Sequence, residues 1–424
     1  MNPIRVINAS KHVAIYLLAS IIPMLINLAI NPLIAMNMQP RDYAIVGFYT
    51  SFNSLISPLI VFYMLHYYTK NFFEVDEEER IILKSTLIKL LIYFSGLLSI
   101  LCFMGIWIYY FIAGVSESFP FFPYALLTVF ALPLTGIYSL TTVDYRMQRK
   151  SLSFFKISLA NSLMLIAMNL FLVVSLKWGA FGKLLAPFVT NLTFFLYCLY
   201  KYRNILHHKF EWDRSKKIII FCIPLTLAAM LTFFTGGYDR VLLERIGNVN
   251  ELGYYVVGIQ IAQYISVFQT SIGSTFQPDL FQAIIQKDSK KLTKVITMLI
   301  GSTAFVVFIF ILLAPIIIDL LTAGRYNESV KYAQIAALST LTSAMYYTVS
   351  QITIARGQTT IPLINKIVGS VLCIFMFNFF ISRYEFVGAA WGLVFSYIMT
   401  LFGNLILLKI FSLRENANQN FTYR

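Results

Sequence analysis

An Arg-x-Gln triplet begins at Arg146 and again at Arg356, and a lysine follows each arginine ten residues later, at Lys156 and Lys366. Lysine and arginine donors match phosphate oxygens well, and an arginine can bind two oxygens at once. Each lysine opens a long apolar segment, so we expect the four cations at matching depths of two similar halves. This pattern indicates a site for an anion such as a diphosphate. The alternative is that these side chains only extend toward lipid headgroups.

A second group of candidates centres on the adjacent charges Asp239 and Arg240. Successive residues of a helix point in different directions, so we expect the two to have different neighbours. Arg240 is a further candidate contact for the anion, and Asp239 is a candidate for reversible binding of a proton or a sodium ion. Asp144 is a second candidate of that kind. A structural role, in which Asp239 holds Arg240 or another helix in place, is the alternative.

Amide side chains recur inside the apolar segments, including Gln260, Gln263, Gln269 and Gln351. Gln260 and Gln263 are three residues apart and are expected on one helical face, where they would line a wet lumen. Many of the other amides are expected to form hydrogen bonds between helices instead.

Composition sets the class of fold that must position these residues. The chain has 424 residues, of which 58% are hydrophobic and 12% charged, whereas soluble domains have about 25% charged residues. We therefore expect an all-α polytopic membrane protein with about twelve spans, since lipid leaves exposed backbone amides unpaired. The predicted spans are Val13–Met36, Ala44–His66, Ile88–Ile112, Phe121–Thr142, Ile157–Leu176, Leu184–Leu199, Ile218–Phe234, Leu252–Ile272, Val295–Leu321, Ala333–Ile354, Leu363–Ile381 and Val387–Ile410. The most polar of these are Leu252–Ile272 and Ala333–Ile354.

The connections between the spans are short, which argues against an enzyme. None of them is long enough for a catalytic or nucleotide-binding domain, and no P-loop motif occurs. The four cysteines and four histidines show no metal-ligand spacing, so no metal or cofactor is predicted. The first apolar run is too long for a signal peptide and is expected to be retained as a span.

Most lysines and arginines fall in alternate connections, and this asymmetry predicts the orientation. With the N-terminus in the cytoplasm, the basic loops all lie inside, which also places the C-terminus inside. The net charge of +14 is therefore explained by topology and by anionic lipid, and no nucleic-acid partner is predicted.

The sequence also contains an internal repeat with an offset of about 210 residues. Pro40–Ala44 aligns with Asn250–Tyr254, and Gly179–Gly182 aligns with Gly388–Gly392. Each repeat has six spans, an even number, so the two bundles are expected to be related by a pseudo-twofold axis along the membrane normal. The predicted division is an N-terminal lobe of residues 1–203, a cytoplasmic linker of 204–216 and a C-terminal lobe of 217–424.

Short motifs spread over nearly the whole chain form a further pattern. They are Pro32–Ala44, Tyr238–Leu243 with Glu251–Tyr255, Leu320–Val330, Arg356–Gln358 with Lys366, and Gly388–Gly392. These segments resemble bacterial polysaccharide transporters, specifically the Wzx-type O-antigen flippases of the multidrug/oligosaccharidyl-lipid/polysaccharide exporter superfamily. Two departures are Ala44, where a glycine is usual, and a first span without an internal arginine.

The resemblance implies two six-helix lobes around a V-shaped cavity, in the inner membrane of a bacterium. The implied substrate is an undecaprenyl-diphosphate-linked oligosaccharide, flipped to the periplasmic leaflet, with a polysaccharide polymerase and a chain-length regulator as further expected partners. Arg146, Lys156, Arg356 and Lys366 would then guide the diphosphate. The rival interpretations are a cation-coupled drug exporter of the same superfamily, a membrane enzyme of polysaccharide assembly, and a non-transporting scaffold.

Overall fold

The computed structural model describes residues 3–208, 210–286, 288–355 and 360–422. Within these ranges the regular elements are helices, and no strand is formed. Contacts divide the chain into two compact units, Met1–Met230 with Leu321–Arg325 and Leu231–Leu320 with Tyr326–Arg424. The prediction of an all-α membrane fold is confirmed.

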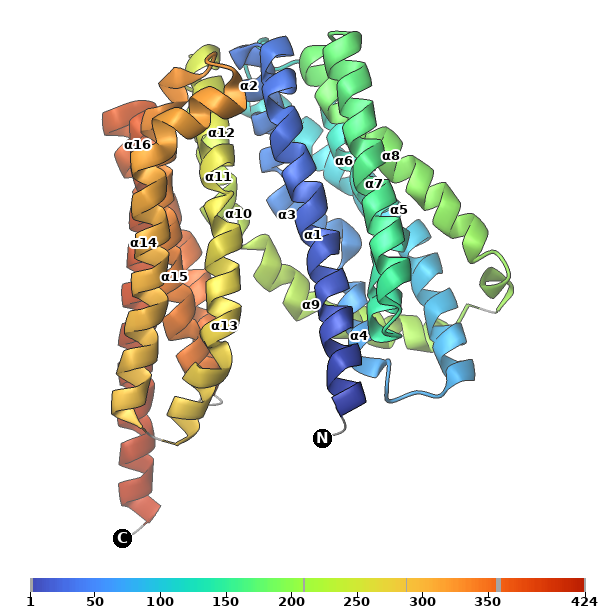
Figure 1. Cartoon of the computed structure of the whole chain (residues 1–424), viewed down its shortest axis with the longest axis vertical. Helices are drawn as coiled ribbons and strands as arrows, with labels where there is room; N and C mark the ends of the chain where they lie inside the picture. The colour runs from blue at the N-terminus through green and yellow to red at the C-terminus, as the bar shows by residue number, and fades with distance from the viewer. Residues whose placement is uncertain (1–2, 209, 287, 356–359, 423–424) are drawn as a thin grey trace. The chain divides into compact units, whose positions relative to one another are not determined.

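The helices of the first unit run from blue to green in Figure 1. A π-helix continues α7, and a short 3₁₀ helix precedes α9. The bounds are α1 Pro3–Asn37, α2 Pro40–Ser51, α3 Asn53–Val61, α4 Met64–Asn71, α5 Glu77–Ala113, α6 Tyr124–Met147, α7 Ser151–Asn169, η1 Leu170–Ser175, α8 Gly179–Lys201, η2 Ile205–His207 and α9 Trp212–Met230.

The second unit begins with two short helices and ends with a very long one. Its last element, α16, is two helices merged across a break at Glu385, whose backbone angles are not helical. The bounds are α10 Phe233–Gly236, α11 Tyr238–Glu244, α12 Val249–Ala262, α13 Ile265–Ile285, α14 Ser289–Thr322, η3 Asn327–Ser329, α15 Val330–Ala355 and α16 Thr360–Thr422.

Each of the twelve predicted spans falls on one or more of these helices. Among the described residues, seven helices are long and apolar enough to cross a membrane, and an eighth results if the bent pair α2 and α3 is one span. α16 contains two predicted spans, one on each side of the break at Glu385. Leu252–Ile272 is divided between the 14-residue α12 and α13, and Ala333–Ile354 has many polar side chains that lower its hydropathy, so neither is among the seven. The chain is a multi-pass membrane protein.

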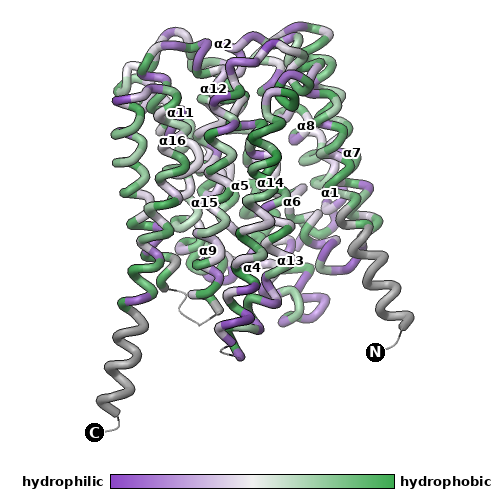
Figure 2. The backbone as a smooth tube through the Cα atoms, turned by 60° about the vertical axis from the view of Figure 1, so that its left-hand side comes forward, coloured by the Kyte–Doolittle hydropathy of each residue, from purple (hydrophilic) through white to green (hydrophobic). Residues whose placement is uncertain are grey.

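The outward faces of the apolar helices show what surrounds them. On α14, Phe305, Phe308, Leu312 and Ile316 are all more than half exposed, and their spacing places them on one face. Figure 2 shows hydrophobic residues along the middle of the helices and hydrophilic residues toward their ends. Apolar surface on this scale requires an apolar solvent, which is the bilayer.

The repeated sequence segments adopt the same local structure. Gln39 is the N-cap of α2, and Asn248 is the N-cap of α12. The third residue after the cap is acidic in both helices, Asp42 in α2 and Glu251 in α12. The glycines that end the second pair of segments are also closely packed, since a Cβ at Gly182 would lie 2.9 Å from the Leu172 backbone oxygen and one at Gly392 would lie 2.7 Å from the Phe377 ring. Only glycine permits these close approaches.

The loops predicted to be cytoplasmic meet at one end of the first unit. Arg214 donates to the backbone oxygen of Glu79 at 3.3 Å, and Lys89 donates to the backbone oxygen of His208. These contacts join the first turns of α5 to the beginning of α9 and to the segment that precedes α9. They agree with the placement of these loops on a single side of the membrane.

Helix α9 packs against α3, α4 and α5 of the first unit. It carries most of the first predicted span of the C-terminal repeat, Ile218–Phe234. The contact-based division therefore falls at Met230, later in the chain than the predicted linker 204–216. The lobe boundaries set by the repeat stay a prediction.

Candidate functional site

A cavity of about 420 Å³ lies within the second unit and is lined by Asp239, Arg240 and Gln263. Helices α10, α12, α13, α15 and α16 supply the remaining walls. The Gly236-Gly237 pair interrupts the first helix of the unit, so that α11 begins at Tyr238. Asp239 therefore stands in the first turn of α11, where free backbone N–H groups favour a negative charge.

The carboxylate of Asp239 is incompletely hydrogen-bonded. Its side chain is 2% exposed, and its Oδ2 accepts a hydrogen bond from the Tyr255 hydroxyl at 2.5 Å. Within the described part of the chain, its Oδ1 and the Nε of the neighbouring Arg240 have no hydrogen-bond partner. A buried carboxylate oxygen without a donor is costly, and it is suited to accept a cation or a proton that comes and goes.

Asp144, the second candidate carboxylate, has a different environment near the end of α6. Its Oδ2 lies 2.8 Å from the Lys84 Nζ, and both side chains are less than a tenth exposed. Its Oδ1 accepts hydrogen bonds from the Tyr68 hydroxyl at 2.6 Å and from the Gln148 amide at 2.8 Å. These donors satisfy both oxygens, so the geometry favours a structural role for Asp144.

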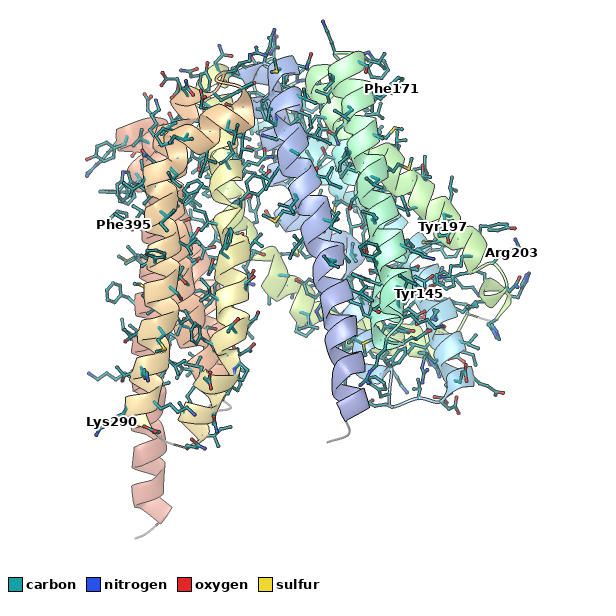
Figure 3. The ribbon with its side chains drawn as sticks, viewed as in Figure 1. Tyr145, Phe171, Tyr197, Arg203, Lys290 and Phe395 are labelled. Atoms are coloured by element: carbon teal, nitrogen blue, oxygen red, sulfur yellow. The ribbon has the colours of Figure 1, made fainter. Side chains whose placement is uncertain are left out.

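Lys156 lines a crevice of about 570 Å³ between α6, α7 and α8 of the first unit. Tyr145 and Tyr197 border it, and apolar side chains such as Ile157 and Met164 form its walls. Figure 3 labels both tyrosines, together with Arg203, which follows α8. The crevice thus combines a cation with aromatic and apolar surface.

The other predicted cations are placed less distinctly. Arg146 is exposed in the last turn of α6, and its guanidinium lies 5.8 Å from the centre of the Phe154 ring. Lys366 is half-buried on α16. Arg356 lies outside the described residues. The structure therefore brings Asp239, Arg240 and Gln263 together, and it places Lys156 in a separate crevice.

The cavity is lined by one of the two glutamines predicted to share a wall. Gln263 is exposed and lines the cavity, whereas Gln260 on α12 is not among its lining residues. Gln263 is the C-cap residue of α12, and α13 begins two residues later. The role of both glutamines in a wet lumen stays a prediction.

Sequence reasoning missed two parts of these sites. Lys84, which precedes the predicted span Ile88–Ile112, is the buried partner of Asp144. The wall that α13 contributes was also missed, although Ser266, Gln269 and Thr270 follow at helical spacing. That periodic run of hydroxyls and amides inside a predicted span is the signal that could have found it.

Comparison with known proteins decides the family. Residues 38–331 match the family described as Polysaccharide biosynthesis protein. The chain belongs to this family. No curated protein sequence matches it. Membership agrees with the resemblance to polysaccharide transporters and makes polysaccharide biosynthesis the setting in which this membrane protein acts.

Solved structures with a similar fold include an inward-facing multidrug resistance MATE family transporter of the MOP superfamily. It is 14% identical, with a TM-score of 0.69 over 94% of this chain and 98% of that one. The lipid II flippase MurJ, inward closed, is 17% identical, with a TM-score of 0.69 over 92% and 87% of the two chains. A mutant of the Vibrio cholerae MATE transporter VcmN is 12% identical, with a TM-score of 0.55 over 95% and 98%. At these identities the likeness establishes the fold, that of twelve-helix transporters.

Proposed function

We propose that this protein is a flippase that moves an undecaprenyl-diphosphate-linked oligosaccharide from the cytoplasmic to the periplasmic leaflet of the bacterial inner membrane. The match of residues 38–331 to the polysaccharide biosynthesis family carries this proposal. The likeness to the lipid II flippase MurJ adds support, because that protein has the same fold and its name describes a lipid-linked substrate. Both termini are placed in the cytoplasm by the distribution of lysine and arginine.

The transport cycle proposed is alternating access, in which the polar part of the substrate passes through the protein while the polyprenyl chain stays in lipid. Arg146, Lys156, Arg356 and Lys366 attract the diphosphate at the cytoplasmic side, and Arg240 contacts it later. The crevice around Lys156 supports this assignment, because a lysine beside apolar walls suits a phosphate joined to a hydrocarbon chain.

Energy for the cycle comes from exchange of a proton or a sodium ion at Asp239. Its buried carboxylate has one oxygen without a donor among the described residues and lines a cavity. Asp144, the other candidate, is already neutralised by Lys84. The structure thus favours Asp239 as the coupling residue.

The direct test is movement of a labelled substrate. The full chain is purified and reconstituted into vesicles that contain a polyprenyl-diphosphate oligosaccharide, and a glycosidase outside reports how much of the lipid has reached the outer leaflet. We expect the glycolipid to reach the outer leaflet faster than in protein-free vesicles, and a pH or sodium gradient should increase this rate further. Exposure at the protein-free rate contradicts the proposal.

A drug exporter of the same fold is the rival outcome. Vesicles loaded with a cationic dye distinguish the two, because an exporter moves the dye and leaves the glycolipid behind. The cavity beside Asp239 holds one acidic and one basic side chain, so it gives no electrostatic preference for an organic cation. Polysaccharide transport is therefore the function retained.

A further inference from the structure

A second cavity of about 220 Å³ adjoins the cavity beside Asp239 within the same unit. Gln269, Thr270 and Tyr347 line both, so the two spaces are adjacent along α13 and α15. We call the combined space the α13–α15 track. It leads away from Asp239 and ends beside Gln277 and Gln351.

The polar groups of the track are almost all uncharged. Among the described residues that line the two cavities, Asp239 and Arg240 are the only charged ones, and both stand at the α11 end. The rest of the polar lining consists of hydroxyl and amide side chains. Those of α13 recur every three or four residues and so share one face of the helix.

The amide side chains of the track have unused hydrogen-bonding capacity. The Gln277 amide donates to Gln351 at 3.3 Å, and the Ser343 hydroxyl, which also donates to the Thr340 backbone oxygen, donates to Gln269 at 3.3 Å. Both contacts to the amides are long, and each amide offers two N–H donors and two acceptor lone pairs. The hydroxyls of α13 donate to backbone oxygens of their own helix and remain available as acceptors. Tyr347 is 50% exposed and lines both cavities.

A purely structural role does not account for this arrangement. Amides that join helices are buried at the contact, whereas Gln277 and Tyr347 are exposed. Polar side chains inside a span, such as those of Gln269 and Gln351, are costly unless water or a ligand contacts them. Hydroxyl and amide groups at regular intervals, with an aromatic face nearby, match the hydroxyls and C–H faces of a sugar.

We propose that the α13–α15 track binds the uncharged sugars of the lipid-linked glycan and selects against sugars that carry a carboxylate. This inference rests on the proposed flippase function and specifies its substrate class. A carboxylate in the track would lose its hydration and would find no cation among the described lining residues beyond the α11 end. A neutral sugar exchanges its water for amides and hydroxyls at much lower cost.

The test uses matched pairs of polyprenyl-diphosphate disaccharides whose distal sugar is either glucose or glucuronic acid. These differ only at C6, a hydroxymethyl in one and a carboxylate in the other. In vesicles with the full chain we expect the glucosyl lipid to reach the outer leaflet at least tenfold faster. Equal rates overturn the inference but leave the flippase function standing. Failure to move either lipid overturns both.

A pair of variants makes the test local to the track. Gln277→Lys introduces a cation beside the glycan and is expected to raise the rate of the glucuronosyl lipid relative to the glucosyl lipid at least fivefold. Gln286→Lys is the control, because Gln286 is exposed just past the end of α13 and lines neither cavity. Rates are normalised to folded protein by size-exclusion chromatography. If the ratio of the glucuronosyl-lipid rate to the glucosyl-lipid rate is the same in both variants and in the unmodified protein, the track is not the glycan site.

Discussion

The two units each bury an aspartate that accepts a hydrogen bond from a tyrosine hydroxyl, and the remaining partners of the two side chains differ. Asp144 of the first unit has Lys84, Tyr68 and Gln148 as donors, so both oxygens are satisfied. Asp239 of the second unit has the Tyr255 hydroxyl on one oxygen, and no donor among the described residues reaches the other. A buried charge that is fully paired holds helices together, whereas one left open beside a cavity can bind a mobile ion.

The largest expected effect is the loss of one member of the buried ion pair. Asp144→Asn leaves Lys84 charged and unpaired, which costs roughly 3–5 kcal/mol. We expect a strongly reduced yield of folded protein and a lower Tm in detergent. Replacing both residues, Asp144→Leu with Lys84→Met, should restore much of the yield. A single variant as stable as the unmodified protein would remove the structural interpretation of Asp144.

Asp239→Asn should leave folding intact and impair transport, which is the reverse of the effect expected for Asp144→Asn. With no paired cation to expose, the folded yield is expected to stay near that of the unmodified protein, while gradient-driven glycolipid movement falls at least tenfold. Tyr255→Phe, which removes the donor to Oδ2, is expected to have a smaller effect. Flipping by Asp239→Asn at the normal rate, with a normal response to the gradient, would show that the coupling ion binds elsewhere.

Replacing the lysines of the repeat should have the next largest effect on function, and the two lysines should act together. Lys156→Gln and Lys366→Gln together are expected to abolish surface polysaccharide in a complementation assay without lowering membrane abundance. Each single change should cause a several-fold loss, because the other lysine still attracts the diphosphate. Lys290→Gln, in the exposed first turn of α14, is the matched control. Full polysaccharide display by the double variant contradicts a role in substrate binding.

The smallest effect is expected at Glu251, which precedes the polar span Leu252–Ile272. Burial raises the pKa of Glu251, but hydrogen bonds from Tyr332 and Lys331 outweigh this and leave the pKa below its ordinary value of 4.5. A lowered carboxyl pKa stabilises the folded state above about pH 4.5, and this stabilisation is lost as the pH falls below that value.

Lys331 is 44% exposed, so solvent weakens its interaction with Glu251. Glu251→Gln should therefore cost about 1 kcal/mol or less at pH 7, and the difference in Tm from the unmodified protein should shrink at pH 4. A Tm difference that is the same at both pH values would exclude an ionic contribution from Glu251.

Much of the fold could be predicted from composition and periodicity. Apolar runs near the thickness of a bilayer identify spans without any knowledge of their partners, since each helix satisfies its own backbone. The two most polar predicted spans, Leu252–Ile272 and Ala333–Ile354, are not among the helices that meet the length and hydropathy criteria for crossing a membrane. Their polarity is informative, because they include most of α12 and α15, which line the cavity beside Asp239.

The sequence by itself determined that the chain crosses the membrane, that its halves repeat, and that Asp239, Arg240 and Gln263 are candidate polar residues. Only the tertiary structure decided that these three line one cavity, and which polar side chains are free to act. Asp144 and Asp239 each accept a hydrogen bond from a buried tyrosine, but Lys84, sixty positions from Asp144 in the sequence, pairs with Asp144. Local sequence specifies where a charge lies along its helix, whereas packing between distant helices determines what it meets there.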